Sequence, residues 1–358
     1  MLERWELSKR LFLKKLPQLQ NPLWIHTASV GEFNTALPLV RELKKEHIIL
    51  ITYFSPRARS YLESLSEEYD ALYPLPADLP CLIKKFEEKV NPKALIILER
   101  EFWFSLIKFT KVKKILLNAY AKNTALERVL AKEFSLIITR TKKDEELFKS
   151  FGAKKVITCG NLKLIYEHAP KSLNIPLGNY VVAGSTHEGE EELILRAFKE
   201  LNLRDFKLII APRHVERSKK VKELSESLGL KTSLYSQANG DWEVLVVDKL
   251  GLLRDLYSYA KVAIVGGTFV PVGGHNLLEP AYYNIPVVFG KYTQKVEDLK
   301  EVLQSFGLGF QAKSEEELKE TLKHLVFEFK KPSVDLKEVG KKVKECYLKA
   351  LLEELRPL

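Results

Sequence analysis

Short apolar runs alternate with amphipathic stretches along most of the chain. Such runs are typical of buried strands, and apolar residues that recur every three or four positions are typical of helices packed on a sheet. Regular alternation of the two predicts parallel strands in a doubly wound α/β sheet. In the first half of the chain the expected strands are 23–27, 48–53, 71–75, 94–98, 114–118, 136–139 and 156–159.

The alternation stops at 167–179, where two prolines, a glycine and the loss of periodicity predict a linker. A chain of 358 residues is also too long for one ordinary core. We therefore predict two Rossmann-like domains, 1–166 and 180–358, facing each other across a cleft. The helices at 336–355 either stay with the second domain or pack back on the first. The strands expected after the linker are 180–183, 207–211, 244–247, 263–265 and 286–289.

The charge is unevenly distributed along the chain. Residues 1–165 carry 29 Lys and Arg against 19 Asp and Glu, a net charge of +10, whereas residues 166–358 carry 28 of each. A basic half suggests a polyanionic partner such as nucleic acid, an anionic membrane or a phosphorylated substrate. Because the sequence has no nucleic-acid recognition motif, we expect no nucleic-acid partner.

The cysteines and the apolar runs of the sequence indicate the cellular compartment of the protein. Cys81, Cys159 and Cys346 are odd in number and far apart, which predicts no disulfide framework, no zinc site and a reducing compartment. No apolar run approaches the roughly 20 residues of a membrane-spanning helix. Charges interrupt residues 1–15 every few positions, so a signal-peptide core is not indicated. We expect neither a membrane span nor export.

Two segments combine aromatic residues with basic ones. Residues 1–16 predict a helix that either lies in a membrane interface or packs on its own domain. Residues 102–114 suit acyl chains and phosphates at a membrane surface, or form a core helix followed by solvated lysines. The apolar face of the first segment is Leu2, Trp5, Phe12, Leu13 and Leu16, and the aromatic residues of the second are Phe102, Trp103, Phe104 and Phe109.

Residues 265–280, V-G-G-T-F-V-P-V-G-G-H-N-L-L-E-P, form the most unusual stretch. Glycine pairs after an apolar strand let a loop approach a ligand closely and present backbone N–H groups. We expect Glu279 and Pro280 to open a helix whose N-terminus favours a phosphate, or Glu279 to accept hydrogen bonds from ribose hydroxyls. A tight structural turn would explain the glycines alone. The candidate ligand-binding residues are Gly273, Gly274, His275, Asn276 and Glu279.

Two other strand ends in the second half carry polar residues. The segment 209–217, I-I-A-P-R-H-V-E-R, places an arginine where it can pair with a phosphate or a sugar carboxylate, or stay exposed on a loop. In 183–190, A-G-S-T-H-E-G-E, the hydroxyls can bind an anion or cap the next helix. The candidates are Pro212, Arg213, His214, Ser185 and Thr186.

A candidate general base follows the first strand, in the segment S-V-G-E that ends at Glu32. The preceding glycine permits a sharp turn that would expose the carboxylate. A general base needs a raised pKa, which partial burial beside another carboxylate supplies. Glu99 and Glu101 follow another strand end and are candidates for that neighbour. The alternative is that Glu32 only stabilises the N-terminus of its helix.

These motifs, in this order, resemble those of the Kdo transferases of lipid A assembly, which move 3-deoxy-D-manno-octulosonic acid (Kdo) from CMP-Kdo. The resemblance runs from about residue 24 to residue 290, and the motifs are specific together rather than singly. They are H-T-A-S-V-G-E (26–32), L-E-R-E-F-W (98–103), G-N-L-K (160–163), S-T-H-E-G-E-E (185–191), A-P-R-H-V-E-R (211–217) and the stretch 265–280.

The resemblance implies a GT-B fold whose first domain binds a phosphorylated acyl-disaccharide, the lipid A precursor, and whose second domain binds CMP-Kdo. It implies Glu32 as general base, inversion at the anomeric carbon, and a peripheral position at the cytoplasmic face of the inner membrane. Without a dinucleotide motif or a D-x-D motif, we expect no cofactor and no metal. The expected acceptor contacts are Ser29, Gly31, Ser55, Arg57, Asn118 and Lys163.

The sequence also departs from the family. The common T-x-T-P-x-G segment is Y-F-S-P-R-A at 53–58, and the usual Asn-Ala-Arg is Asn-Ala-Tyr at 118–120. Leu252 replaces a family glutamate, and Leu164 and Ile165 stand where relatives often have an aromatic residue and Asp. These changes concern the acceptor and part of the donor contacts.

Two other classes fit part of the pattern. A nucleotide-sugar epimerase or hydrolase could use the same two-domain scaffold, but Glu32 acting alone fits transfer better. A non-catalytic polyanion-binding protein would explain the basic half. The neutral half, with its motifs gathered at strand ends, argues against that class.

Overall fold

The structure is a computed structural model that describes residues 5–203, 205–238 and 241–356. The N-terminal residues of the predicted first helix, Leu2 among them, lie outside the described residues. Within the described ranges, no helix is both long and apolar enough to cross a membrane.

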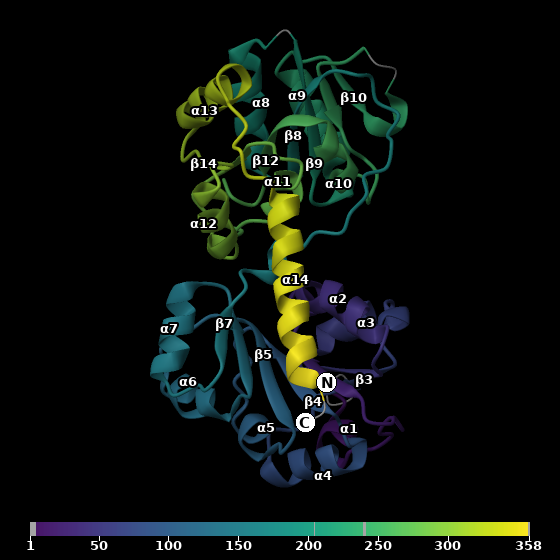
Figure 1. Cartoon of the computed structure of the whole chain (residues 1–358). Helices are drawn as coiled ribbons and strands as arrows, with labels where there is room; N and C mark the ends of the chain where they lie inside the picture. The colour runs from purple at the N-terminus through teal and green to yellow at the C-terminus, as the bar shows by residue number, and fades with distance from the viewer. Residues whose placement is uncertain (1–4, 204, 239–240, 357–358) are drawn as a thin grey trace. The chain divides into compact units, whose positions relative to one another are not determined.

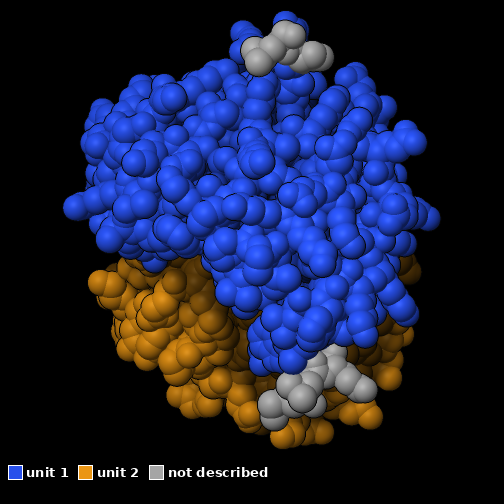
Figure 2. Space-filling view, turned by 90° about the horizontal axis from the view of Figure 1, so that it is seen from below, with its two compact units in different colours: residues 1–167, 339–358 blue, residues 168–338 orange. Residues whose placement is uncertain are grey.

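The chain divides into two compact units, drawn in blue and orange in Figure 2. Unit 1 comprises residues 1–167 and 339–358, and unit 2 comprises residues 168–338. The division falls one residue after the predicted end of the first domain. Almost all of the predicted linker is grouped with unit 2, and most of the C-terminal helix is grouped with unit 1.

Within the described part of unit 1, seven parallel strands form one sheet in the order β3-β2-β1-β4-β5-β6-β7. The strand order reverses between β1 and β4, and β4 pairs with β1 along Leu23–His26. Ligands of such sheets bind outside the carboxyl ends of strands at this point. The strands are β1 (Leu23–Thr27), β2 (Ile49–Tyr53), β3 (Ala71–Pro74), β4 (Ala94–Leu98), β5 (Lys113–Ala119), β6 (Leu136–Thr139) and β7 (Val156–Thr158).

Helices cover both faces of this sheet (Figure 1), so β1, β2 and β4 are buried along their whole length. Burial on both faces explains why these strands read as continuous apolar runs rather than as alternating patterns. The helices of unit 1 are α1 (Leu7–Phe12), α2 (Val30–Lys44), α3 (Arg59–Glu63), α4 (Pro80–Val90), α5 (Phe104–Phe109), α6 (Ala125–Leu130) and α7 (Lys142–Ser150), together with most of α14 (Leu336–Leu355).

Unit 2 repeats the plan: in its described residues, seven parallel strands pair in the order β10-β11-β9-β8-β12-β13-β14. The strands are β8 (Asn179–Thr186), β9 (Phe206–Pro212), β10 (Thr232–Leu234), β11 (Val244–Val246), β12 (Ala260–Val265), β13 (Val287–Phe289) and β14 (Gly309–Gln311). The helices are α8 (Glu190–Leu201), α9 (Ser218–Ser227), α10 (Leu253–Leu256), α11 (Leu278–Ala281), α12 (Glu297–Ser305) and α13 (Glu315–Phe327).

The doubly wound α/β prediction is confirmed, and every predicted strand is present to within three residues at each end. The two edge strands of unit 2, β10 and β14, were not predicted. Each has three residues, and neither Thr-Ser-Leu nor Gly-Phe-Gln is an apolar run. Edge strands bury less surface than central ones, so their sequences carry a weaker apolar signal.

The N-terminal helix is much shorter than the predicted 1–16. Glu6 and Leu13 have left-handed backbone angles, φ 50° and 51°, which end α1 after six residues. The predicted apolar face is also divided, because Leu13 packs in the core while Phe12 is 69% exposed and Trp5 is 40% exposed. Arg10 is buried, and its guanidinium donates to the carbonyl oxygens of Trp5, Phe54 and Leu75.

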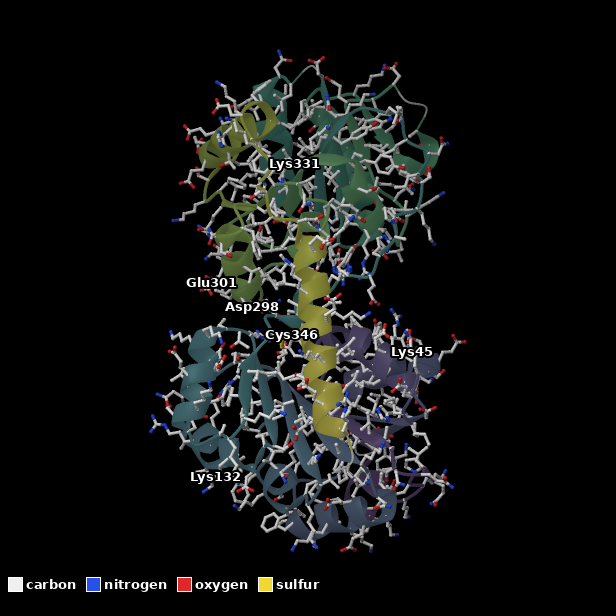
Figure 3. All side chains as sticks on the ribbon, in the orientation of Figure 1. Lys45, Lys132, Asp298, Glu301, Lys331 and Cys346 are labelled. Atoms are coloured by element: carbon white, nitrogen blue, oxygen red, sulfur yellow. A yellow bond between two sulfur atoms is a disulfide. The ribbon has the colours of Figure 1, made fainter. Side chains whose placement is uncertain are left out.

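Helix α14 contacts the end of β7 (Figure 3 labels Cys346 on this helix). Cys346 forms a disulfide with Cys159, directly after β7, and the buried Tyr347 donates a hydrogen bond to the Gly160 carbonyl at 2.9 Å. A Cβ at Gly340 would lie 2.3 Å from the carbonyl oxygen of Leu164, so the helix approaches the chain after β7 closely.

The prediction that the chain has no disulfide is therefore wrong. Cys159 and Cys346 are 187 positions apart, and only the docking of α14 brings their Cα atoms to 5.6 Å. Pairing over such a distance cannot be deduced from cysteine spacing. Among the described residues Cys81 is a free, exposed thiol.

Candidate active site

The candidate base lies in the first turn of α2, after the carboxyl end of β1. Ser29 caps this helix through its hydroxyl, which accepts the Glu32 N–H at 3.3 Å. The carboxylate of Glu32 turns back and accepts the N–H of Ala28 at 2.6 Å. Burial, followed by the negative charge of Glu101, raises the pKa of Glu32 to about 8. The side chain can therefore gain and lose a proton near neutral pH.

Glu101 and Glu99 differ in how their charges are compensated. The Glu99 carboxylate pairs with Arg140 at 2.6 Å and with Lys163 at 3.9 Å. It also accepts a hydrogen bond from the side-chain amide of Asn118 at 3.3 Å. Glu101 is held by the indole N–H of Trp103 at 2.8 Å, and burial raises its own pKa. Its charge acts on Glu32 more strongly than that of Glu99. Glu101 is thus the neighbour that disfavours ionisation of Glu32.

Asn118 connects this cluster to the loop after β7. It is wholly buried with a left-handed φ of 54°, and its side-chain oxygen accepts the N–H of Leu162 at 2.9 Å. This bond places Lys163, the next residue, beside Glu99. The structure therefore brings Asn118 and Lys163 together with the carboxylates of unit 1.

The remaining expected acceptor residues lie around the same strand end. The N–H of Ser55 donates to the carbonyl of Ala28 at 2.9 Å, and Arg57 is exposed in the short 3₁₀ turn that follows. The predicted role of Gly31 in a sharp turn is wrong, because it is a helical residue of α2 without a positive φ. It is exposed, and a Cβ there would meet only the Ser29 hydroxyl, at 3.8 Å.

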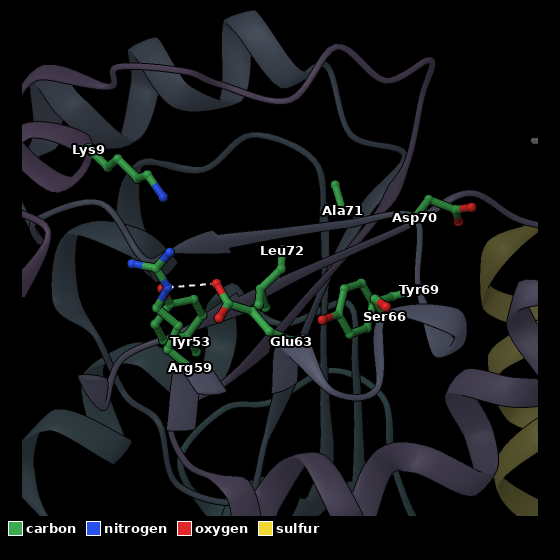
Figure 4. A pocket seen from close by; sticks show the side chains of 9 residues that line it. All are labelled: Lys9, Tyr53, Arg59, Glu63, Ser66, Tyr69, Asp70, Ala71 and Leu72. Carbon is green, nitrogen blue, oxygen red and sulfur yellow. Dashed lines mark hydrogen bonds and ion pairs between the residues drawn. The ribbon is translucent and has the colours of Figure 1, made fainter. Parts of the chain in front are cut away.

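A pocket of about 230 Å³ also lies in unit 1 (Figure 4). Its cations are already neutralised, since Arg59 pairs with Glu63 at 2.7 Å and Lys9 pairs with Glu6 at 2.8 Å. It therefore lacks the uncompensated positive charge that a phosphate would need. Its lining residues are Lys9, Tyr53, Arg59, Glu63, Ser66, Tyr69, Asp70, Ala71 and Leu72.

In unit 2 the predicted polar residues stand at the carboxyl ends of β8 and β9. Thr186 is buried and its hydroxyl donates to Glu191 at 3.2 Å, while Ser185 has a left-handed φ of 57°. The N-cap of α8 is Gly189, so the alternative that these hydroxyls cap the helix is wrong. The backbone N–H of Arg213 donates to the carbonyl of Thr186 at 2.9 Å. The side chains of Arg213 and His214 are exposed beyond Pro212, which ends β9.

The glycine-rich stretch is a loop that only glycines can form. Gly267, Gly273 and Gly274 have φ of 68°, 100° and 94°, and the N–H of Gly274 donates to the Gly267 carbonyl at 2.7 Å. A Cβ at Gly266 would lie 2.4 Å from the Ser185 carbonyl oxygen. These glycines are thus explained by backbone angle and close packing.

Two histidines meet over this loop. The Nε2 atoms of His187 and His275 are 2.8 Å apart, and their rings stack with centroids 5.1 Å apart. Burial, together with the positive charge nearby, lowers the pKa of His275 to about 4. Arg213 and Lys295 contribute to that positive charge. A neutral imidazole pair beside two cations suits an anionic ligand.

Helix α11 begins at Leu278, one residue before the predicted start. It has four residues, with Pro280 in its first turn as expected. The side-chain oxygen of Asn276 accepts the N–H of Leu278 at 3.0 Å, so the first backbone N–H of the helix already has a partner. One of the N–H groups that we expected to face a phosphate is therefore satisfied within the protein. Glu279 lies 3.4 Å from the Asn276 amide and 3.4 Å from Arg254.

Comparison with known proteins decides among the candidate functions. The family described as 3-deoxy-D-manno-octulosonic-acid transferase (kdotransferase) matches residues 3–165. The 3-deoxy-D-manno-octulosonic acid transferase of Aquifex aeolicus is 52% identical over 99% of this chain and 100% of that protein. The chain belongs to the Kdo transferase family. The transferase of Chlamydia muridarum is 30% identical over 87% of this chain and 80% of its own.

Solved structures confirm the fold. The UDP-GlcNAc 2-epimerase of Neisseria meningitidis matches with a TM-score of 0.61 and 13% identity, over 93% of this chain and all of that one. MurG of Acinetobacter baumannii matches with a TM-score of 0.59 and 12% identity, over 94% and 100%. The chain is thus a glycosyltransferase with a GT-B fold, and the epimerase and non-catalytic alternatives are wrong.

Three residues of these sites were not predicted from the sequence: Arg140, His187 and Glu190. Arg140 compensates Glu99, His187 pairs with His275, and Glu190 is buried beneath the glycine-rich loop. His187 and Glu190 lie inside the motif S-T-H-E-G-E-E, from which a role is predicted only for Ser185 and Thr186.

Proposed function

We propose that this enzyme moves Kdo from CMP-Kdo to a hydroxyl of a lipid A precursor, a tetraacyl disaccharide bisphosphate, with inversion at the anomeric carbon. The observation that carries the proposal is the half-buried carboxyl of Glu32 after the end of β1, whose pKa is raised to about 8. A carboxylate with such a pKa is matched to taking a proton from an attacking hydroxyl.

In the proposed reaction Glu32 acts as general base. The acceptor hydroxyl loses its proton to the Glu32 carboxylate as its oxygen bonds to the anomeric carbon of Kdo from the face opposite the leaving group. The bond from that carbon to the CMP phosphate breaks, and CMP leaves with the electron pair. General-base assistance of this kind is worth roughly 10²–10⁴-fold in rate.

We assign the donor to the strand-end loops of unit 2. Arg213 and the loop at Gly273 and Gly274 would meet the charge that develops on the leaving phosphate. Asn276 would add a hydrogen bond, and Glu279 would hold the ribose. Ser185, Thr186, Pro212, His214 and His275 complete the proposed donor contacts, on the support of their clustering at the ends of β8, β9 and β12.

We assign the acceptor to unit 1. Ser29 and Gly31 lie in the segment that leads to Glu32, and Ser55 donates to the carbonyl of Ala28. The exposed Arg57 and the half-buried Lys163 would provide positive charge for a phosphorylated ligand. Asn118 would act through the backbone that it holds at Leu162. The +10 charge of residues 1–165 fits an acceptor that carries phosphates.

We further propose that the enzyme sits at the cytoplasmic face of the inner membrane, bound peripherally. Support comes from aromatic side chains exposed beside basic residues: Phe12 is 69% exposed and Phe104 is 45% exposed. Each Lys or Arg close to an anionic bilayer contributes about 1 kcal/mol of attraction.

Transfer is expected to need no metal, because a monophosphate leaving group can be stabilised by cationic side chains and backbone N–H groups. Addition of a chelator should therefore leave the initial rate of Kdo transfer unchanged. The measurement is the rate with and without EDTA, followed by addition of Mg²⁺. Loss of activity that Mg²⁺ restores would contradict metal independence.

The test of the proposed function is incubation with CMP-Kdo and the tetraacyl precursor, with mass analysis of the lipid product. Wild type should add Kdo, and Glu32→Gln should lower kcat at least about 100-fold while it still binds CMP. Glu88→Gln, an exposed glutamate on α4, is the matched control. Near-normal turnover by Glu32→Gln would remove the general-base assignment, and no Kdo on the lipid with wild type would remove the acceptor.

A further inference from the structure

Glu190 is a wholly buried carboxylate at the first position of α8. One oxygen accepts the backbone N–H of His187 at 2.7 Å and that of Gly267 at 2.6 Å, and the other accepts the N–H of Phe269 at 3.3 Å. A single side chain thus joins the loop after β8 to the glycine-rich loop after β12.

The atoms around this carboxylate are closely packed. A Cβ at Gly266 would lie 2.6 Å from the Glu190 carboxylate, 2.4 Å from the Ser185 carbonyl oxygen and 2.6 Å from the Thr186 Cα. The N–H of Gly266 donates to the Gly184 carbonyl at 2.8 Å. The path of the glycine-rich loop is therefore set by the atoms beneath it, the carboxylate included.

Stability of the helix does not require a buried acid here. Burial raises the pKa of Glu190 to about 7, against the opposing effect of its three N–H partners, so ionisation of this group is costly. An exposed acid in the first turn would serve the helix dipole without that cost. Glu192, in the same turn, is exposed and pairs with Arg196.

The neighbouring residue holds a third loop in the same way. The buried carboxylate of Glu191 pairs with Arg217 at 2.6 Å, just after β9, and accepts the Thr186 hydroxyl at 3.2 Å. The His187 and His275 rings join the loops again, 2.8 Å apart. Two consecutive glutamates therefore organise the loops after β8, β9 and β12.

We propose that Glu190 is a positioning residue of the donor site: its carboxylate holds the loops after β8 and β12 in the arrangement that binds the nucleotide, without touching the nucleotide itself. The inference rests on the proposed binding of CMP-Kdo by these loops. Because the loops would bind the donor before and during reaction, loss of the carboxylate raises the KM for CMP-Kdo and changes kcat little.

The first variant is Glu190→Gln, which keeps the shape of the side chain. Its amide NH₂ cannot accept a hydrogen bond, so at least one of the three backbone N–H groups loses its partner. A buried N–H that loses its partner is costly, so the loop that carries it is expected to shift. The Kd for CMP, measured by calorimetry, and the KM for CMP-Kdo should therefore both rise about tenfold or more.

Several readouts separate positioning from general loss of structure. At saturating donor, kcat of Glu190→Gln should stay within about threefold of wild type, at a temperature well below its measured unfolding midpoint. The peptide that contains Gly267 and Phe269 should exchange its amide hydrogens faster than in wild type. Glu192→Gln is the matched control on the same helix and should behave as wild type.

An unchanged Kd for CMP in folded Glu190→Gln, or a fall in kcat at unchanged KM, overturns the proposal. If that variant does not fold, Glu190→Asp keeps the carboxylate on a shorter side chain. It should show a smaller rise in the KM for CMP-Kdo, again with little change in kcat. A wild-type KM in Glu190→Asp also overturns the proposal. Arg213→Ala separates the two proposals. If it also leaves the Kd for CMP unchanged, the donor assignment itself fails; if it alone weakens CMP binding, only the positioning role fails.

Discussion

The Glu32 side chain is half-buried after the end of β1, within reach of the charge of Glu101. Both effects disfavour its ionised form, and they outweigh the hydrogen bonds from Ala28 and Ser29 that favour it. Glu99 contributes less, and its carboxylate pairs with Arg140 at 2.6 Å. The proton of Glu32 is thus held more tightly than that of an ordinary carboxyl, up to a pKa of about 8.

This balance predicts the pH dependence of the reaction. Only ionised Glu32 can accept a proton, so kcat/KM should rise with pH and level off above about pH 8. Glu101→Gln removes the nearby negative charge, which lowers the pKa of Glu32 and moves the rising limb to lower pH. The check is a kcat/KM profile for wild type and variant. A limb that stays in place would show that Glu101 does not act on Glu32.

How far the sequence predicts single residues depends on what each residue does. The pairing of Glu32 with a carboxylate after another strand was predictable, since parallel strands end at one edge of the sheet. Glu190 was not, because nothing in the sequence says that a helix-start glutamate turns inward. The predicted sharp turn at Gly31 was wrong, because this glycine lies in a regular helix and needs no special backbone angle.

At the scale of elements, α14 is joined to unit 1 by contacts that the sequence did not indicate. The Cys159–Cys346 disulfide and the hydrogen bond from Tyr347 to Gly160 fix its middle, and Lys344 pairs with Glu42 and Glu167. These contacts lie directly before the loop that carries Lys163. Helix α14 therefore supports the backbone on which a proposed acceptor residue stands.

The disulfide gives a prediction at this scale. Cys346→Ser should lower the free energy of unfolding by about 2–4 kcal/mol, because the bond closes a long loop in the unfolded chain. The measurement is denaturant unfolding of both proteins without reductant. Cys81→Ser, at the exposed thiol, is the control and should unfold as wild type. In denaturant, wild type should show one reactive thiol, and three reactive thiols would show that the bond does not form.

The central strands were predictable because a strand buried on both faces is apolar throughout, as β1, β2 and β4 are. The edge strands β10 and β14 and the limits of α1 were not, since they depend on local backbone angles and packing rather than on apolar periodicity. Residues with left-handed backbone angles flank α1 on both sides. Neither Glu6 nor Leu13 is a residue type that predicts such an angle.

For the whole molecule, the break in periodicity near residue 167 located the division between the units, because a boundary interrupts the alternation of strands and helices. Periodicity could not show that most of α14 belongs to unit 1, since an amphipathic helix does not identify the surface that it covers. The charge pattern follows the same division, with +10 in residues 1–165 and zero in the remainder.

The uneven charge and the exposed aromatic side chains of unit 1 together predict that the enzyme binds anionic membrane surfaces. Binding to vesicles that contain phosphatidylglycerol should exceed binding to neutral phosphatidylcholine vesicles and should weaken as salt is added, since salt screens exposed charges. Phe12→Ser and Phe104→Ser should each weaken it severalfold, because transfer of a phenylalanine side chain from water is worth about 1.5–3 kcal/mol when complete.

Phe327 of α13 supplies the matched control: it is 68% exposed, close to the 69% of Phe12, but lies in the electrically neutral half of the chain. Phe327→Ser should leave vesicle binding as in wild type, measured by sedimentation with the same lipids. Equal losses for Phe12→Ser and Phe327→Ser would indicate general stickiness rather than a docking surface. Binding that ignores lipid charge would instead show that the basic half serves only the phosphorylated acceptor.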